Sequence, residues 1–312
     1  MIKADNLTKF YGSKRALGPV SFEIGDGQAI GFLGLNGAGK TTALRILACD
    51  LRPSGGNVRI DKVDALASPH EVRKLVGFLP EQTPVYQDML VRDFLVFAGR
   101  IRGMTPDRLT KRLAEVLETT NLTHMAWEPV RTLSHGYRQR VGVAQAIIHD
   151  PKFVILDEPT RGLDPVQIVD MRGLVKSLKQ KHTVMISSHI LTEIAETCDR
   201  ALVLGDGEII GQVSLTAEMR EEGKIDLMVE SEAGVPTSAI AEKLQNVAGV
   251  KELAGSSSAT IHRFELRCTG DVRRQIDEAI TEGGWKLYRL DRRTDLENIF
   301  LGMVEGGTRE RN

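Results

Sequence analysis

A glycine-rich stretch near the start of the chain has the residue types and spacing that bind phosphate groups. Residues 34–41 read Gly-Leu-Asn-Gly-Ala-Gly-Lys-Thr and fit the pattern G-x-x-x-x-G-K-S/T, between an apolar run and a helical pattern. Glycines allow backbone N–H groups to converge on phosphate oxygens, and Lys40 supplies a positive charge for the β- and γ-phosphates. The Thr41 hydroxyl offers an oxygen ligand to Mg²⁺. We therefore predict that MgATP binds here, through Gly34, Asn36, Gly37, Ala38, Gly39, Lys40, Thr41 and Thr42.

Two adjacent acidic residues close an apolar run further along the chain. Residues 153–159 read Phe-Val-Ile-Leu-Asp-Glu-Pro, which predicts a buried strand that ends in Asp157 and Glu158. Taken alone, such a pair more often belongs to a solvated loop, but a phosphate loop in the same chain favours a hydrolytic role. We expect Asp157 to hold Mg²⁺ through water and Glu158 to orient and polarise the attacking water.

A third segment lies shortly before these acids and resembles a known family. Residues 133–140 read Leu-Ser-His-Gly-Tyr-Arg-Gln-Arg and resemble the signature motif of ABC ATPases, most often Leu-Ser-Gly-Gly-Gln. Ser134 and Gly136 match the motif, whereas His135 and Tyr137 depart from its commonest form. The resemblance implies that Ser134 and Gly136 grip the γ-phosphate of ATP held by a second subunit, so that two chains sandwich each ATP. That partner would be an identical chain or a paralogous ATPase subunit.

Three further positions resemble ABC ATPase landmarks in the expected order. Residues 161–164, Arg-Gly-Leu-Asp, resemble the D-loop, which runs along the dimer interface. His189, at the end of an apolar run, resembles the switch histidine that hydrogen-bonds the γ-phosphate. Tyr11 resembles the aromatic residue that stacks on adenine, although a tyrosine of the core or of an edge strand would also fit. The resemblance assigns catalysis to Glu158, His189 and Lys40.

One position departs from the family pattern. The glutamine of the Q-loop usually follows Leu-Pro after a strand, and residues 79–82 here read Leu-Pro-Glu-Gln. Glu81 takes the place of the glutamine, and Gln82 stands one residue late. A carboxylate can still reach Mg²⁺, which prefers oxygen ligands, so both residues stay candidates for the metal side of the site. The predicted metal set is Thr41, Asp157, Glu81 and Gln82.

Several details resemble, within this family, the ATPases of ABC-2 type exporters, and most nearly the gliding-motility ATPase subgroup. The likeness to ABC ATPases covers residues 1–220, and the finer details are the segments 79–81, 137–140, 156–160, 188–191 and 296–301. The resemblance implies an ATP-hydrolysing subunit that energises a separate membrane permease through ATP-driven dimer closure. Coupling to the permease would pass through the Q-loop region and a helical segment at 88–120.

The elements around these residues predict an α/β fold, which the resemblance specifies as the P-loop NTPase core of ABC ATPases. Short apolar runs alternate with helical patterns, which is typical of a mostly parallel sheet with helices on both faces. Residues 88–120 are helical without strands and predict an inserted helical subdomain. The expected strands are 28–33, 152–156, 183–187 and 201–204, and the expected helices are 42–48, 137–149 and 166–179.

A charged stretch at 218–224 marks a change of rhythm, so we expect an ABC-type ATP-binding domain over 1–220 and a small α+β domain over 221–312. In the second domain, strand and helix patterns alternate in the order βαββαβ, which is typical of a ferredoxin-like domain. The expected strands are 225–230, 250–253, 262–268 and 285–290, with helices at 238–247 and 272–282 and a closing helix at 295–304. Dimerisation, packing and small-molecule sensing all suit this domain, in which no residues form a recognisable site.

Composition limits the alternatives. The formal net charge of −1 gives no basic field for nucleic acid, and the three cysteines are too scattered for a metal site. No signal peptide and no run of about 18 apolar residues occurs, so we expect a cytoplasmic protein attached to the membrane through its permease. Two other classes remain: a soluble ABC ATPase acting on a ribosome or nucleic acid, and a nucleotide-binding regulator without turnover. The single phosphate loop argues against the first, and intact Asp157, Glu158 and His189 argue against the second.

Overall fold

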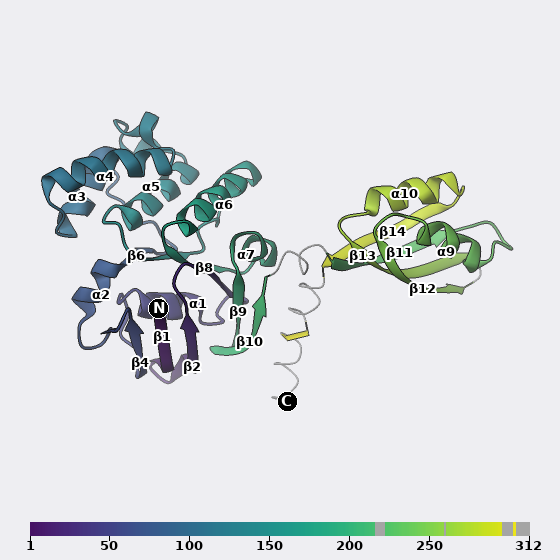
Figure 1. The fold of residues 1–312 in the computed structure, drawn as a ribbon, viewed down its shortest axis with the longest axis horizontal. Helices are drawn as coiled ribbons and strands as arrows, with labels where there is room; N and C mark the ends of the chain where they lie inside the picture. Colours follow the sequence, from purple (N-terminus) through teal and green to yellow (C-terminus); the bar gives the residue numbers. More distant parts are fainter. Residues whose placement is uncertain (216–221, 259, 295–301, 304–312) are drawn as a thin grey trace. The chain divides into compact units, whose positions relative to one another are not determined.

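The chain divides into two compact units in the computed structural model, Met1–Ser214 and Leu215–Asn312 (Figure 1). Each unit contains a cluster of buried apolar side chains of its own. The structure describes residues 1–215, 222–258, 260–294, 302 and 303. Within these residues, no helix combines the length and the apolar character needed to cross a membrane.

The first unit is built on a six-stranded sheet in the order β10-β9-β3-β8-β7-β6. All neighbours in this sheet run parallel except β10, which is antiparallel to β9. Every residue of β3, β7 and β8 is buried, as expected for strands that are covered on both faces. The predicted, mostly parallel sheet is thereby confirmed. Its strands are β3 (Ala29–Leu33), β6 (Val76–Leu79), β7 (Phe153–Asp157), β8 (Thr183–Ser188), β9 (Arg200–Gly205) and β10 (Glu208–Ser214).

Helices cover both faces of this sheet. Ile30 and Phe32 of β3 share a core with Leu44 of α1, whereas a Cβ on the intervening Gly31 would overlap Ile194 of α7. The helices next to the sheet are α1 (Lys40–Leu47), α2 (Pro69–Leu75), α5 (His135–Ile147), α6 (Pro165–Lys179) and α7 (Leu191–Thr197). The expected helical subdomain is also present, as α3 (Val91–Ile101), α4 (Pro106–Thr119) and the 3₁₀ helices η1 (Thr123–Met125) and η2 (Val130–Thr132).

An antiparallel sheet of four strands, in the order β2-β1-β4-β5, has no counterpart in the sequence prediction. Its central strand β1 makes register shifts with both neighbours, and such shifts interrupt the alternation of buried and exposed residues that marks a strand. The sheet packs into the same hydrophobic cluster as α1. Its strand β1 ends at Tyr11. Its strands are β1 (Ile2–Tyr11), β2 (Lys14–Ile24), β4 (Gly55–Ile60) and β5 (Val63–Asp64).

The second unit contains an antiparallel sheet and two helices in the predicted order βαββαβ. The strand order β12-β13-β11-β14 places the first and third strands of this unit in the centre, as in ferredoxin-like domains. The elements are β11 (Glu222–Glu230), α9 (Thr237–Gln245), β12 (Val250–Ser258), β13 (Ile261–Thr269), α10 (Arg273–Glu282) and β14 (Lys286–Thr294). β11 begins inside the charged stretch 218–224, and the predicted closing helix at 295–304 lies outside the described residues apart from 302 and 303.

Both helices of the second unit cover the same face of its sheet. Ile225, Leu227 and Val229 of β11 are buried in one cluster with Ile240 of α9 and Ile276 of α10. Because side chains alternate along a strand, the residues between them lie on the opposite face. That opposite face is not covered by either helix of the described unit.

Gly77 of β6 leaves no room for a side chain, because a Cβ there would stand 1.9 Å from the backbone oxygen of Ala146 in α5. We expect Gly77→Ala to lower the free energy of unfolding by about 1–3 kcal/mol, since strand and helix must move apart. Gly173→Ala in α6 is the matched control, because nothing lies within 4 Å of its added carbon. That control should raise stability by about 0.5–1 kcal/mol. Urea denaturation of the full chain measures both variants, and equal stabilities would contradict this packing.

Candidate ATP-hydrolysis site

The phosphate loop joins the end of β3 to the start of α1. Gly37 and Gly39 adopt positive φ angles of 86° and 99°, which glycine reaches without strain. A Cβ on Gly39 would also lie 2.7 Å from the backbone oxygen of Ala16, so this position requires glycine. No side chain caps the start of α1, and the N–H groups of its first turn are therefore available to phosphate oxygens.

Lys40 lies folded over this loop. Its side chain is buried, and Nζ donates hydrogen bonds to the backbone oxygens of Gly34 at 2.7 Å and Leu35 at 3.3 Å. The same nitrogen lies 3.5 Å from Oε1 of Glu158. The positive charge of Lys40 is therefore balanced by Glu158 of the same chain.

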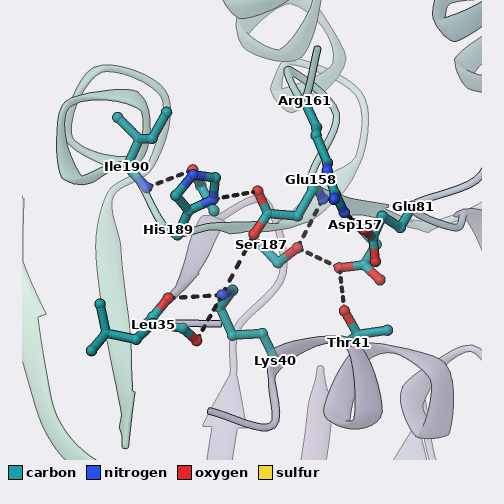
Figure 2. A network of polar contacts seen from close by, with 12 residues as sticks. Leu35, Lys40, Thr41, Glu81, Asp157, Glu158, Arg161, Ser187, His189 and Ile190 are labelled. Carbon is teal, nitrogen blue, oxygen red and sulfur yellow. Dashed lines mark hydrogen bonds and ion pairs between the residues drawn. The ribbon is translucent and has the colours of Figure 1, made fainter. Parts of the chain in front are cut away.

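Glu158 directly follows β7 and is held on both carboxylate oxygens (Figure 2). Its Oε2 lies 2.9 Å from Nδ1 of His189, which follows β8, while Oε1 faces Lys40. Its backbone N–H donates to the Ser187 hydroxyl at 2.9 Å. A φ of 49° places Glu158 in the left-handed region, a conformation that is uncommon outside glycine and often found at functional sites. The structure thus brings together the three residues predicted for catalysis.

Asp157 ends β7 and is fully buried, yet only one of its carboxylate oxygens has hydrogen-bond partners. Oδ1 accepts hydrogen bonds from the hydroxyls of Thr41 at 3.1 Å and Ser187 at 2.5 Å. Oδ2 is buried without a partner among the described residues. Burial raises the pKa of Asp157, because the charged form loses its hydration. A buried carboxylate oxygen without a partner, next to a threonine hydroxyl, fits a hard cation such as Mg²⁺.

Of these groups, Lys40, Thr41, Glu158 and His189 line a cavity of about 840 Å³. Tyr11 stands at the end of β1 with 48% of its surface exposed and lines this cavity, as adenine stacking requires. The predicted residues that line it are Tyr11, Asn36, Gly37, Ala38, Gly39, Lys40, Thr41, Thr42, Glu81, Glu158 and His189. Those that do not line it are Gly34, Gln82, Ser134, Gly136 and Asp157.

Sequence reasoning missed several polar residues around the cavity. Lys14 and Arg15 line it beside the exposed tyrosine, and their signal was a basic pair that follows an aromatic residue. Ser187 donates a hydrogen bond to the carboxylate of Asp157 and accepts one from the backbone N–H of Glu158. Ser188 donates at 2.7 Å to the buried carboxylate of Glu193. The two serines close an apolar run, which marks them as strand-end residues but gives no indication of their partners.

The two candidates for the Q-loop role occupy different surroundings. Glu81 lines the cavity and forms an ion pair with Arg161 of the segment that resembles the D-loop (Figure 2). Gln82 is exposed and does not line the cavity. The carboxylate, rather than the amide, therefore stands beside the nucleotide cavity.

The signature segment lies at the start of α5, outside the cavity of its own chain. The exposed Ser134 caps this helix by accepting a hydrogen bond from the backbone N–H of Tyr137 at 3.4 Å. Gly136 is buried, and a Cβ on it would lie 2.7 Å from Gln167 of α6. His135 bonds the backbone oxygen of Arg161 at 3.0 Å. Within one chain, the signature and the phosphate loop are therefore two separate surfaces.

Known proteins share this arrangement of sequence and fold. The profile of the ABC transporter family matches residues 17–161. YxlF of Bacillus subtilis, an uncharacterised ABC transporter ATP-binding protein, is 32% identical over 97% of this chain and 99% of its own length. The bacitracin transport ATP-binding protein BcrA of Bacillus licheniformis is 30% identical over 99% of this chain and 98% of its own. The dimeric structure of MJ0796, a bacterial ABC transporter cassette, has a TM-score of 0.64 at 27% identity and covers 70% of this chain and 100% of its own.

The fold, the cavity and the similar proteins all indicate an ABC ATPase. The predicted ABC ATPase core is confirmed, with its parallel sheet, its helical subdomain and an additional antiparallel sheet in the second unit. Two relatives match nearly the whole length of the chain, including that second unit. The chain therefore belongs to the ATP-binding proteins of ABC transporters, in which ATP hydrolysis drives transport.

Proposed function

We propose that this chain hydrolyses MgATP in the cavity of its first unit and uses ATP-driven pairing of two chains to power an ABC-2 type exporter. The observation that carries the proposal is the capture of Glu158 between Lys40 and His189. A carboxylate with both oxygens occupied is a poor acceptor for a proton from water. Without nucleotide, the general base is therefore in place but engaged.

ATP releases that base. The γ-phosphate carries more negative charge than a carboxylate, so it draws the hydrogen bonds of Lys40 and His189 to itself. Glu158, freed from both, then polarises the attacking water. Tyr11 stacks on adenine and the N–H groups of the phosphate loop hold the phosphate chain, which fixes the direction of attack. Hydrolysis in this scheme depends on the phosphate that is lost in the reaction.

The second half of each site comes from another chain, identical or paralogous. Ser134 and Gly136 stand at the N-terminus of α5, and a helix N-terminus attracts anions. Close to them, α6 exposes Val166 at 73% and Val169 at 64%, and α6 contacts Gly136 through Gln167. An exposed apolar surface around an anion-binding segment suits a protein interface. Solved relatives include a dimeric cassette and a dimeric post-hydrolysis state bound to ADP and Pi.

We assign Mg²⁺ to the hydroxyl of Thr41 and the partnerless Oδ2 of Asp157, with Glu81 in the Q-loop role. Among the described residues, no cluster of three or more His, Cys, Asp or Glu side chains can hold a metal by itself. This fits Mg²⁺, which usually binds through one or two carboxylates together with nucleotide phosphates. When bound, the ion neutralises charge that develops on the phosphates.

A groove beside α3 is the proposed contact for the membrane permease. Its volume is about 570 Å³, and its apolar lining includes Tyr86, Phe94, Phe97 and Ile101. Ile101 is 67% exposed although it is apolar. The rim is basic, with Arg73, Lys74 and Arg102. Such a groove accommodates an amphipathic helix that has acidic residues at its edge.

The exporter class follows from the relatives. BcrA is a bacitracin transport ATP-binding protein, and the linearmycin resistance ATP-binding protein LnrL of Bacillus subtilis is 30% identical over 86% of this chain. Transport and resistance to antibiotics are both served by export. We therefore place the chain at the cytoplasmic face of the membrane, held there by its permease. Within the exporters, the likeness to the gliding-motility subgroup rests on the segments 79–81 and 188–191 among others.

The role proposed for Glu158 predicts that a variant without this carboxylate stays dimeric in MgATP. Glu158→Gln should bind MgATP, hydrolyse it at least about 100-fold more slowly and pair more tightly, because the γ-phosphate that joins the chains persists. Sedimentation velocity of the variant should give a dimer Kd at least about tenfold lower in MgATP than in MgADP. Lys40→Ala is the control that should lose MgATP binding and, with it, the difference in dimer Kd between MgATP and MgADP.

Hydrolysis at the wild-type rate by Glu158→Gln would show that Glu158 is not the base. Slow hydrolysis with the same Kd in both nucleotides would instead refute ATP-driven pairing of this chain. The two parts of the proposal can therefore fail separately.

The buried carboxylate of Asp157 predicts a conflict between stability and activity. Because burial raises its pKa, the charged form destabilises the metal-free fold, and that cost falls as pH is lowered toward the raised pKa. We expect Asp157→Asn to abolish Mg²⁺-dependent hydrolysis yet to melt no lower than wild type in EDTA. Its advantage in Tm should shrink as the pH is lowered toward the raised pKa of Asp157. A lower Tm for the variant would show that the carboxylate serves the fold.

The cavity lining distinguishes Glu81 from Gln82. Glu81→Ala should raise the Mg²⁺ concentration for half-maximal hydrolysis by about three- to tenfold, because it removes an oxygen ligand near the metal. Gln82→Ala, the neighbouring control, should keep the wild-type Mg²⁺ dependence. Steady-state phosphate release across a Mg²⁺ titration decides the assignment, and the reverse result would give the role to Gln82.

A further inference from the structure

The open face of the sheet in the second unit carries its charges in rows. Side chains opposite one another on adjacent strands form rows across a sheet. One row is basic: Arg263 of β13 and Arg289 of β14 stand opposite Met228, which lies between them on β11. The next row along the strands is acidic and consists of Glu265, Asp226 and Asp291. These two sets are called the basic row and the acidic row below.

Within the acidic row, like charges stand opposite one another, although Lys224 and Arg267 lie on the far side of this row from the basic row. Asp226 has an acid directly opposite on both neighbouring strands, and like charges in that position destabilise a sheet. Glu265 is compensated by an ion pair with Lys224, and Asp291 by one with Arg289 at 2.7 Å. Among the described residues, neither Asp226 nor the exposed Arg263 has an ion-pair partner. One acid and one arginine on the same face therefore lack a counter-charge.

A hollow of about 570 Å³ lies over both rows. It exists because β12 presents small residues there, Ala254, Gly255 and Ser256. Asp226 and Arg263 are both part of its lining. The hollow therefore leaves space for a long side chain to reach Asp226 from outside the unit.

We propose that this open face binds the same face of a second copy of the chain. A two-fold axis that runs across the strands, between the basic row and the acidic row, sets each row over its opposite in the other copy. An axis along the strands would set like charges over like charges. In the favoured arrangement, Arg263 of each copy stands over Glu265 of the other, whose charge Lys224 already compensates. From there Arg263 enters the hollow and reaches across one strand to Asp226, a carboxylate that a guanidinium can bind through two hydrogen bonds.

The size of the face indicates a weak contact. Its four strands have nine residues each, so the face spans roughly 500–600 Å² on each copy. The total of about 1,000 Å² lies at the lower limit of specific interfaces. Because the contact is formed mainly by charges, added salt should weaken it. It involves no residue of the ATP site, so it forms without nucleotide and stands apart from ATP-driven pairing.

Sedimentation equilibrium of the full chain without nucleotide tests the proposal. We expect the wild type to dimerise with a Kd on the order of 10 µM, and to do so more weakly in about 0.5 M NaCl. Arg263→Asp and Asp226→Arg should each raise the Kd at least about tenfold, because each sets like charges against each other in its own dimer. An equimolar mixture of the two variants should regain the wild-type Kd, since the new acid of one chain meets the new arginine of the other.

Rescue by mixing separates contact between chains from contact within one chain. A pair within one chain would be restored only by placing both substitutions in the same chain, and the mixture would then stay monomeric. Arg274→Asp on α10 is the matched control, because this exposed arginine pairs with Glu278 away from the open face, and it should keep the wild-type Kd. The proposal is overturned by a wild type that stays monomeric at about 100 µM, by charge variants with unchanged Kd, or by a mixture without rescue.

Discussion

Parallel strands bring their carboxyl ends to one edge of a sheet, and the ATP site depends on three such ends lying side by side. The order β3-β8-β7 places the phosphate loop, His189 and the acidic pair on adjacent strands. Short connections therefore suffice to bring Lys40 within 3.5 Å of Glu158, from positions 118 residues apart in the chain (158 minus 40). Backbone hydrogen bonding fixes that geometry before any nucleotide arrives, so the site is preorganised by the sheet itself.

The same edge concentrates unfavourable features that a purely structural sheet would avoid. Asp157 is buried with one oxygen that has no hydrogen-bond partner among the described residues, and Glu158 has a left-handed φ of 49°. Lys40 and His189 hold both carboxylate oxygens of Glu158, whereas Asp157 accepts hydrogen bonds from the hydroxyls of Thr41 and Ser187 on one oxygen. Backbone strain and unsatisfied polar groups can persist where the surrounding structure holds the backbone in place. Here the fully buried strands β7 and β8 provide that support.

Sequence patterns predicted those parts of the molecule whose signals are local. The strands β3, β7 and β8 each contain a short apolar run, and the phosphate loop has its own fixed spacing. The antiparallel sheet at the N-terminus was not predicted, because the register shifts of β1 interrupt its alternation of buried and exposed residues. Contacts between distant residues were not predicted either. No sequence spacing shows that Glu81 pairs with Arg161, because the two belong to different loops that only the folded sheet brings together. The pattern supplied candidates, and tertiary placement selected Glu81 as the one that lines the cavity.

The two proposed pairing surfaces differ because only one of them needs ATP. With both, the ATP sites can separate without dissociation of the two chains. A dimer closed by the γ-phosphate alone would separate after each hydrolysis, and closing again would require a new encounter between chains. The contact that we propose between the basic and acidic rows needs no nucleotide, so it would keep two chains at a high effective concentration while the ATP sites open. Closure then becomes a step within one assembly. The contact must stay modest in area, because a tight one would add stability to open and closed states alike without driving either.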